Sequence, residues 1–261
     1  MGKTSNYPRH CLIFTFSTVP DLTLATSSGV LRVRSGTVEK IKTKLAGMSG
    51  EIEMEIKKIK NSQLTKKDRD VMKWVNKMGF VTIELIACQF DVALSTAYGR
   101  VKKLVDHHYL QHHKIYYGLP GIYCVAKRGI EWIGNHLPLI KSIPTGSYDH
   151  DLQVTKVMLM LSKKYNCEFI SERELRCLRA QDGIGQRKHI PDGELLLNDK
   201  RIAVEVELST KGNRRLQKIM NEYMKNFDIH EVWYFCGNNE IKRKMMKYQA
   251  SHSFLKVFDF G

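Results

Sequence analysis

Apolar residues recur every three or four positions through the middle of the chain, and this spacing predicts a series of short helices. The first begins at Thr65, where Asp68 three residues later predicts a capping box, and it ends at Gly79. Two more helices are expected over 83–90 and 96–106, the last opened by Ser95. In the third helix the apolar positions face inward and the polar and basic positions face outward.

The pattern then changes to one that is typical of strands. Residues 109–117 and 121–125 predict two strands around the turn 118–120, and 127–136 predicts a closing helix. Three helices followed by a β-hairpin resemble a winged helix-turn-helix, in which the third helix lies in the major groove of DNA and the hairpin touches the phosphate backbone. The turn-forming residues 142–147 mark a domain boundary.

Charge strengthens the DNA-binding interpretation. The 261 residues carry a formal net charge of +15, and residues 56–141 contain 15 basic against 6 acidic residues, or +9. Such an excess indicates a polyanionic partner, nucleic acid before membrane. The alternatives are a solvated basic helix face and a winged domain used for protein contact. The residues predicted to touch DNA here are Tyr98, Arg100, Lys102, Lys103, His112, His113, Lys114 and Tyr116.

Beyond residue 142 the order of elements becomes regular. The expected elements are helix 149–165, strands 168–171, 190–197 and 202–208, helix 213–227, strand 231–236, helix 239–250 and strand 254–260. This αβββαβ order gives a mixed α+β or α/β fold. The chain is therefore divided into a β-rich extension over 1–55, a winged helix-turn-helix domain over 56–141 and an α/β domain over 142–261.

Three acidic residues interrupt the apolar strands of this last domain. If residues 198–199 form a two-residue turn, the register of the hairpin places Asp192 opposite Glu205. Side chains alternate along a strand, so Glu205 and Glu207 share a face. Three carboxylates would then converge on one patch of the sheet. A three-residue loop would instead turn Asp192 to the other face.

Like charges on an apolar sheet repel each other and are costly to bury unless a cation neutralises them. Hard oxygen donors without Cys or His suit Mg²⁺ or Mn²⁺, and a carboxylate-held divalent ion is the usual apparatus for hydrolysing phosphodiesters. We therefore predict that Asp192, Glu205 and Glu207 bind Mg²⁺ or Mn²⁺. The alternative is an edge hairpin whose acidic residues face solvent. The chain has no Walker A loop or Rossmann fingerprint, so no nucleotide cofactor is expected.

The acidic residues resemble the motif of the PD-(D/E)xK nuclease superfamily, which has the restriction-endonuclease-like fold. The motif would comprise Pro191-Asp192 on one strand and Glu205-Val206-Glu207 on the next. Glu207 stands where the usual pattern has Lys. The resemblance implies a restriction-endonuclease-like αβββαβ core and a catalytic role for Asp192, Glu205 and Glu207.

The same resemblance implies supporting residues. Lys211 would supply the displaced positive charge at the scissile phosphate, and Glu172 or Glu174 would add a further catalytic acid, with Glu172 preferred. Arg214 and Arg215, at the start of the next helix, would bring more positive charge to the DNA phosphate.

Longer stretches of the sequence resemble a narrower family within this superfamily. A winged helix ahead of His150-Asp151, Ser171–Arg176, Pro191–Gly193 and Val204–Lys211 is similar to the replication-relaxation proteins, especially the MobC-type relaxases of mobilisable plasmids. The likeness covers about residues 60–240. It implies a site- and strand-specific nick at a plasmid transfer origin during conjugative mobilisation. It also implies an accessory mobilisation protein and a coupling ATPase as partners.

Two other functions fit the sequence. A non-catalytic plasmid DNA-binding regulator of replication or transcription would carry the winged helix and a degenerate nuclease domain. A site-specific restriction or transposition endonuclease would cut both strands. Whether a covalent protein–DNA intermediate forms stays open, and Tyr223 is one conceivable nucleophile among 11 tyrosines.

The first fifty residues carry no predicted chemistry. Alternation over 12–19, 22–26 and 30–33 predicts a small sheet with a turn at 27–29, and 51–60 has a helix-forming composition. The six cysteines form no CxxC pair and are expected to be thiols. We find no apolar run long enough to span a bilayer and no convincing signal-peptide cleavage site, so we expect a cytoplasmic protein without membrane insertion.

Overall fold

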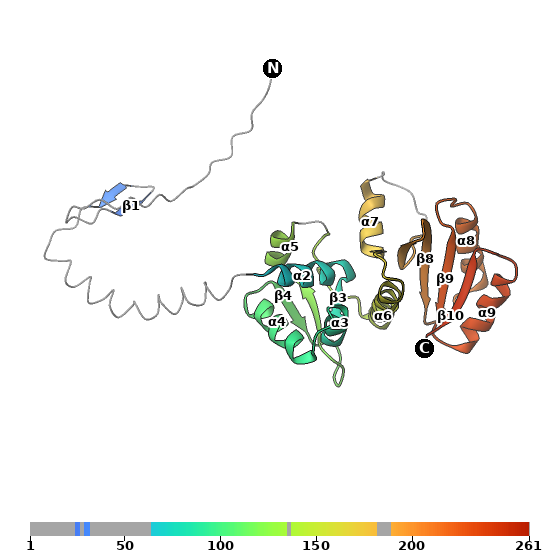
Figure 1. Cartoon of the computed structure of the whole chain (residues 1–261), viewed down its shortest axis with the longest axis horizontal. Helices are drawn as coiled ribbons and strands as arrows, with labels where there is room; N and C mark the ends of the chain where they lie inside the picture. Colours follow the sequence, from blue (N-terminus) through green and yellow to red (C-terminus); the bar gives the residue numbers. More distant parts are fainter. Residues whose placement is uncertain (1–23, 27–28, 32–63, 135–136, 182–188, 261) are drawn as a thin grey trace, which may run out of the picture. The chain divides into compact units, whose positions relative to one another are not determined.

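The chain divides into two compact units, Met1–Gln63 and Leu64–Gly261. The computed structural model describes residues 24–26, 29–31, 64–134, 137–181 and 189–260 (Figure 1). In the first unit, β1 (Leu24–Thr26) pairs antiparallel with β2 (Gly29–Leu31). Residues 27–28 of the predicted turn lie outside the described residues. The strand predicted over 12–19 and the helical segment over 51–60 lie outside the described residues.

The second unit begins with the arrangement of a winged helix. Its elements are α2 (Lys66–Met78), β3 (Phe80–Thr82), α3 (Ile83–Gln89), α4 (Leu94–Asp106), β4 (Leu110–His113), β5 (Ile122–Val125) and α5 (Lys127–Ile133). The strands form an antiparallel sheet in the order β3-β5-β4. Three helices and the hairpin were predicted. The short strand β3 was missed, because three residues are too few to show a period.

Capping determines where α2 begins and ends. The Asp68 N–H donates to Thr65 Oγ1 over 3.2 Å, and the Thr65 N–H donates to Asp68 Oδ2 over 2.8 Å, which is the predicted capping box. Gly79 ends the helix with φ of +93°, a backbone conformation that glycine adopts without strain. The expected start of α4 was wrong: the helix begins at Leu94 after Ala93, and Ser95 lies inside the first turn.

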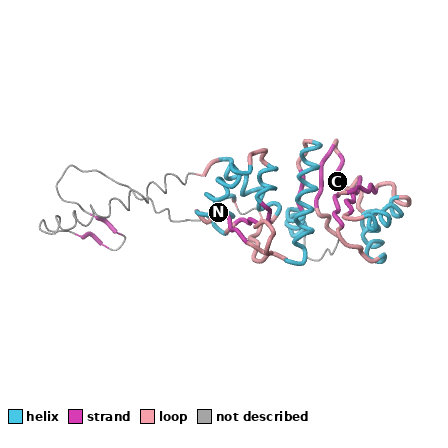
Figure 2. The backbone as a smooth tube through the Cα atoms, turned by 90° about the horizontal axis from the view of Figure 1, so that it is seen from below, coloured by secondary structure: helices cyan, strands magenta, loops and turns pink. Residues whose placement is uncertain are grey.

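A mixed five-stranded sheet forms the rest of the unit (Figure 2). The elements are α6 (Tyr148–Tyr165), β6 (Phe169–Ser171), α7 (Glu172–Gln181), β7 (Gly193–Leu197), β8 (Lys200–Glu207), α8 (Asn213–Met224), β9 (Glu231–Cys236), α9 (Asn239–Gln249) and β10 (Leu255–Asp259). The strand order is β10-β9-β8-β7-β6. Strands β6, β7 and β8 are antiparallel, and β9 and β10 run parallel to β8.

Helices cover both faces of this sheet. Met158 of α6 packs with Val204 and Val206 on one face, and Met220 of α8 packs with Ala203 and other apolar residues on the opposite face. The predicted helices and strands occur in the predicted order, but helix α7, which was not predicted, lies between the first and the second strand of the expected αβββαβ order.

The turn between β7 and β8 sets the register of the hairpin. Asn198 and Asp199 have φ of +50° and +60°, as the two central residues of a type I′ turn require. Leu197 therefore pairs with Lys200, and Gly193 pairs with Val204. The two-residue turn is confirmed, and it brings Asp192 to the point where β7 begins.

Helix α7 joins the sheet to the winged helix. The Arg173 guanidinium donates to the backbone oxygens of Asn76 over 3.0 Å and Pro138 over 2.7 Å. Lys77 Nζ lies 3.2 Å from a carboxylate oxygen of Glu174. The turn predicted over 142–147 contains a 3₁₀ helix, Thr145–Ser147, inside this second unit. Among the described helices, none combines the length and apolar character that crossing a membrane requires.

Candidate functional site

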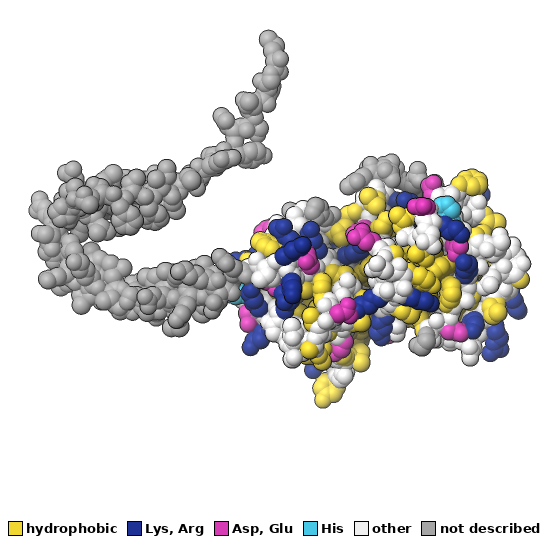
Figure 3. All heavy atoms as spheres, viewed as in Figure 1, with side chains coloured by type: hydrophobic (Ala, Val, Ile, Leu, Met, Phe, Trp, Pro, Cys, Tyr) yellow, Lys and Arg dark blue, Asp and Glu magenta, His cyan; other side chains and the backbone are white. Residues whose placement is uncertain are grey.

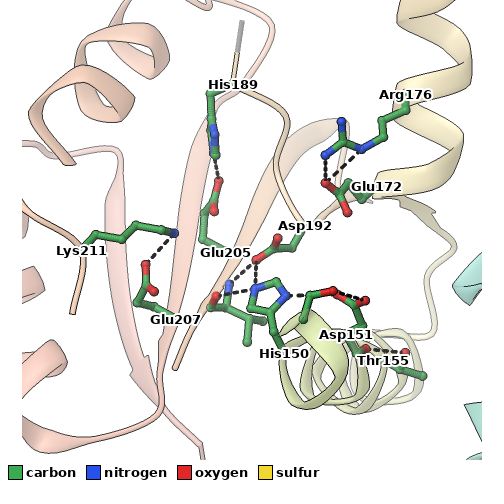
Figure 4. A network of polar contacts seen from close by, with 12 residues as sticks. His150, Asp151, Thr155, Glu172, Arg176, His189, Asp192, Glu205, Glu207 and Lys211 are labelled. Atoms are coloured by element: carbon green, nitrogen blue, oxygen red, sulfur yellow. Dashed lines mark hydrogen bonds and ion pairs between the residues drawn. The ribbon is translucent and has the colours of Figure 1, made fainter. Parts of the chain in front are cut away.

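Asp192 lies one residue before the first residue of β7 and bonds to the neighbouring strand. Its Oδ2 accepts the backbone N–H of Val206 over 2.7 Å. His150, from α6, places Nε2 3.0 Å from the Val206 carbonyl oxygen and 3.4 Å from the same Asp192 oxygen (Figure 4). The backbone N–H and carbonyl of Val206 are thus bonded by two side chains, at a position of β8 that is no longer paired with β7.

This contact holds His150 in its charged form. Hydrogen bonds to Asp151, whose Oδ1 lies 3.3 Å away, and to Asp192 raise the pKa of His150 to about 10. Burial raises the pKa of Asp192, and the charge of Glu205 adds to that rise, although His150 and the Val206 N–H oppose it. His150 is therefore an imidazolium at neutral pH and neutralises charge at Asp192.

Glu205 is almost completely buried, with 1% of its surface exposed. Its Oε1 lies 2.5 Å from His189 Nε2 and accepts a hydrogen bond from the Tyr223 hydroxyl on α8. Burial lowers the pKa of His189, but the hydrogen bond and charge of Glu205 outweigh it, so that the pKa is raised. The sequence analysis had assigned no role to His189. The structure makes it a direct partner of Glu205.

Glu207 is buried two residues further along β8, on the same face as Glu205 by the alternation of a strand. Lys211 Nζ lies 2.5 Å from Glu207 Oε2. Tyr234 on β9 is fully buried beside this face, and among the residues that the structure describes its hydroxyl has no hydrogen-bond partner. Burial, together with the charges of Glu205, Glu207 and Asp192, raises the pKa of Tyr234 well above its usual value. Tyr234 could not be identified from the sequence, because its local pattern is that of an ordinary apolar strand residue.

Each of the three carboxylates thus has its own basic partner: His150 for Asp192, His189 for Glu205 and Lys211 for Glu207. In the parts of the chain that the structure describes, no group of three His, Cys, Asp or Glu side chains is placed to hold a metal ion. Asp192 and Glu205 offer only oxygen donors, the type of ligand that Mg²⁺ and Mn²⁺ prefer.

Glu172 begins α7 and lines a cleft of about 300 Å³ together with Asp192 and His150. Its backbone N–H donates to the Asp192 carbonyl over 3.3 Å, and its carboxylate pairs with Arg176. Glu174 instead accepts the Ser171 N–H over 2.8 Å and does not line the cleft. Of the two candidates, Glu172 is the one next to Asp192.

Three basic side chains also line this cleft, namely Lys77, Lys141 and Arg173. They come from the winged helix, the connecting segment and α7. The cleft at Asp192 is therefore lined by both acidic and basic side chains, and the basic ones suit a phosphate group.

The predicted DNA-contacting residues of α4 separate into two sets. Tyr98 and Lys102 are exposed. Arg100 Nη1 lies 2.8 Å from one carboxylate oxygen of the buried Asp68, and Lys103 Nζ lies 3.4 Å from the other. Burial opposes ionisation of Asp68, but hydrogen bonds from Thr65 and the charge of Lys103 outweigh it and lower the pKa. Arg100 and Lys103 thus connect α4 to α2.

The hairpin residues also have partners. The His112 ring stacks on Tyr123 with centroids 4.9 Å apart, while His113 is half-buried. Lys114 Nζ lies 5.7 Å from the centre of the Tyr117 ring. The Tyr116 hydroxyl donates to the Thr145 carbonyl over 3.3 Å. Tyr117, which the sequence analysis did not single out, is the most exposed aromatic of the wing at 99%.

Further positive charge lies outside the winged helix. Arg214 and Arg215 are exposed in the first turn of α8, as predicted from the sequence. On the face seen in Figure 3, Lys and Arg side chains occur over both the winged helix and the sheet. The positively charged surface is therefore not confined to residues 56–141.

Comparison with known proteins gives little further information. No protein-family model matches the chain, and no curated protein gives a significant match. Among solved structures, the adhesin competence repressor of Streptococcus pyogenes is similar with 17% identity and a TM-score of 0.26, over 56% of this chain and 93% of that one. AbfR of Staphylococcus epidermidis has 17% identity and a TM-score of 0.25, over 49% and 96%. At these TM-scores the similarity does not support a conclusion about the fold or the activity of this chain.

Proposed function

We propose that this protein is a metal-dependent DNA nickase, which finds its site with the winged helix and cuts one strand at the acidic site of the sheet. The proposal includes the MobC-type role at a plasmid transfer origin, with an accessory mobilisation protein and a coupling ATPase as partners. The observation that carries it is the burial of Glu205 and Glu207 on β8, next to the half-buried Asp192, which lines a cleft together with Glu172.

The cost of this cluster supports a functional role. Taking a charge out of water costs several kcal/mol per ion in folded proteins, and ion pairing often fails to recover it relative to apolar side chains. Glu205 and Glu207 are 1% and 4% exposed, and both lie in a sheet that is otherwise apolar. A sheet that needed only stability would be served better by Val or Leu at these two positions.

In the proposed site Asp192 and Glu205 would hold Mg²⁺ or Mn²⁺. Such an ion would supply Lewis-acid chemistry, which polarises a phosphate and lowers the pKa of water. His150 brings a positive charge to the cleft, and Lys211, held by Glu207, brings another close to the carboxylates. Glu207 completes the acidic shell or orients the attacking water through this pair.

A nicking assay tests the proposal. The substrate is a supercoiled plasmid that carries the DNA encoding this chain with its flanking sequence, incubated with Mg²⁺ or Mn²⁺. Glu205→Gln removes the charge of the most buried acid. Glu194→Gln is the matched control, since Glu194 is a buried glutamate on the adjacent strand β7, paired with Arg201 over 3.6 Å.

Open circles with the unaltered protein and with Glu194→Gln, but not with Glu205→Gln or after chelation by EDTA, are the expected result. Linear product would instead identify an endonuclease that cuts both strands. Absence of cleavage by the unaltered protein, while it binds the same DNA, would overturn the nickase.

A non-catalytic DNA-binding regulator is the second candidate, and one observation favours it. Every carboxylate of the cluster already has a basic partner, and the described residues contain no three-ligand metal group. The regulator predicts that calorimetric titration with Mn²⁺ gives the same weak heats for the unaltered protein and for Glu205→Gln. The nickase predicts saturable binding that this substitution abolishes.

A further inference from the structure

A groove of about 650 Å³ runs along helix α8, from Asn213 to Lys225. Helices α8 and α9 bury their apolar sides together on one face of the sheet, so their polar sides face outward. Tyr248, near the end of α9, lines the same groove. The groove shares no lining residue with the cleft at Asp192 and is therefore a separate feature of the surface.

The charge of this surface indicates a polyanionic partner. Helices α8 and α9 carry seven basic and two acidic residues between them, and Lys225 follows α8. Arg214 and Lys225 are exposed in the groove, and in the described part of the chain neither pairs with a carboxylate. Lys218 Nζ lies 3.9 Å from Glu222, the acidic residue that lines the groove. Such an excess of positive charge attracts phosphates.

Three amides and an aromatic ring separate a nucleic acid from other polyanions. Asn213, Gln217 and Asn221 lie four residues apart, so they follow one side of α8 at intervals of about 6 Å. The Gln217 amide nitrogen donates to Asn221 Oδ1 over 3.2 Å, and the Gln217 oxygen and the Asn221 nitrogen have no partner among the described residues. Amides that can donate and accept suit the edges of bases, and a tyrosine ring suits the face of a base.

The same features favour a single strand over a duplex. In a duplex the bases stack on each other and their pairing edges are occupied, whereas a single strand offers both to a concave, basic surface with an aromatic side chain. An acidic protein segment would use the positive charges but would leave the amides and Tyr248 without a base to contact.

Helix α8 also connects this groove with the acidic site. A carboxylate oxygen of Glu222 accepts the backbone N–H of His189 over 2.5 Å, and the His189 ring pairs with Glu205. Tyr223, the next residue of α8, donates a hydrogen bond to Glu205 from its hydroxyl. A strand that leaves the acidic site along α8 would therefore enter the groove.

We propose that this groove binds a single strand of DNA, with phosphates on Arg214 and Lys225, base edges on the amides and one base stacked on Tyr248. The proposal rests on the proposed nicking, since a nick releases a strand end, and the groove would hold that strand close to the site.

The test measures the fluorescence anisotropy of a labelled strand of about fifteen thymidines with the full chain in EDTA, where no cleavage occurs. Saturable binding with a Kd of about 1–100 µM at physiological salt is expected. The double substitution Arg214→Gln/Lys225→Gln should make the plot of log association constant against log salt shallower by about 1.4, because each lost phosphate contact removes about 0.7. The matched control is Lys156→Gln/Lys164→Gln, which removes two exposed charges from α6 and should retain the slope.

Tyr248→Leu keeps an apolar side chain and removes the ring, so it should weaken binding about fivefold or more without changing the salt slope. Absence of saturable binding, equal slopes in the two double variants, or an unchanged affinity in Tyr248→Leu would each overturn the proposal. Displacement of the strand by an equal charge concentration of polyglutamate would assign the groove to an acidic protein and would also overturn it.

The outcome is separate from that of the nicking assay. A protein that nicks the plasmid but fails this binding test contradicts only the groove. A protein that binds the strand as expected but leaves the plasmid uncut contradicts only the nickase.

Discussion

Asp68→Asn tests the assignment of Arg100 and Lys103 as supports of the winged helix. Asp68 is 2% exposed in the first turn of α2 and accepts hydrogen bonds from Thr65, Arg100 and Lys103. Asparagine keeps the shape and one oxygen for the Thr65 N–H. It removes the negative charge that both basic side chains of α4 approach.

The expected loss follows from these contacts. A hydrogen bond to a charged group contributes about 1.5–3 kcal/mol, and removing one member of a buried pair costs still more. The side chains of Arg100 and Lys103 are 24% and 29% exposed, so water recovers part of their interaction. We expect Asp68→Asn to lower the free energy of unfolding by about 2 kcal/mol. Thr65→Ala, which removes only the cap, should cost about 1 kcal/mol.

Urea denaturation followed by circular dichroism measures both losses. The pKa of Asp68 in the folded state lies below its unfolded value of 3.8. Its contribution is therefore present above about pH 4 and is lost as the pH falls through the folded pKa, so the difference between the two proteins should shrink as the pH falls below 3.8. A loss of less than about 0.5 kcal/mol at pH 7, or a difference that does not shrink below pH 3.8, would refute the reasoning.

Four other substitutions have defined outcomes. The pKa of His150 is raised from 6.5 to about 10. The stability advantage of the unaltered protein over His150→Gln should therefore be full below pH 6.5 and vanish as the pH rises through about 10. Thermal unfolding of both proteins across this pH range measures the advantage, and a difference that stays constant would contradict the expectation. Gly129→Ala would place Cβ 2.3 Å from the Tyr109 carbonyl oxygen and should lower the free energy of unfolding by about 2 kcal/mol. Gly99→Ala meets open space in α4 and should raise the free energy of unfolding by about 0.5–1 kcal/mol. Equal melting temperatures of the two variants would contradict both expectations. Asp199→Gly should raise the free energy of unfolding by about 0.5–1 kcal/mol, because φ of +60° suits glycine, and a loss of stability would contradict the type I′ turn.

Interactions between neighbours in the sequence were predictable from it. Thr65 and Asp68 are three residues apart, so their capping box follows from local spacing alone. Asn198 and Asp199 tolerate the left-handed backbone of a two-residue turn, and this fixed the register that brings Asp192 toward β8. The alternation of β8 likewise placed Glu205 and Glu207 on one face.

The sequence by itself determined most helices and strands and the acidic positions, because periodicity, caps and turns depend on residues only a few positions apart. Only the tertiary structure decided which side chains face these positions. His150 reaches Val206 across 56 residues, and Arg100 reaches Asp68 across 32. Such partners depend on how the helices pack against the sheet and against each other. A basic residue on the outward face of a helix has the same sequence pattern around it whether its side chain contacts DNA or a buried carboxylate.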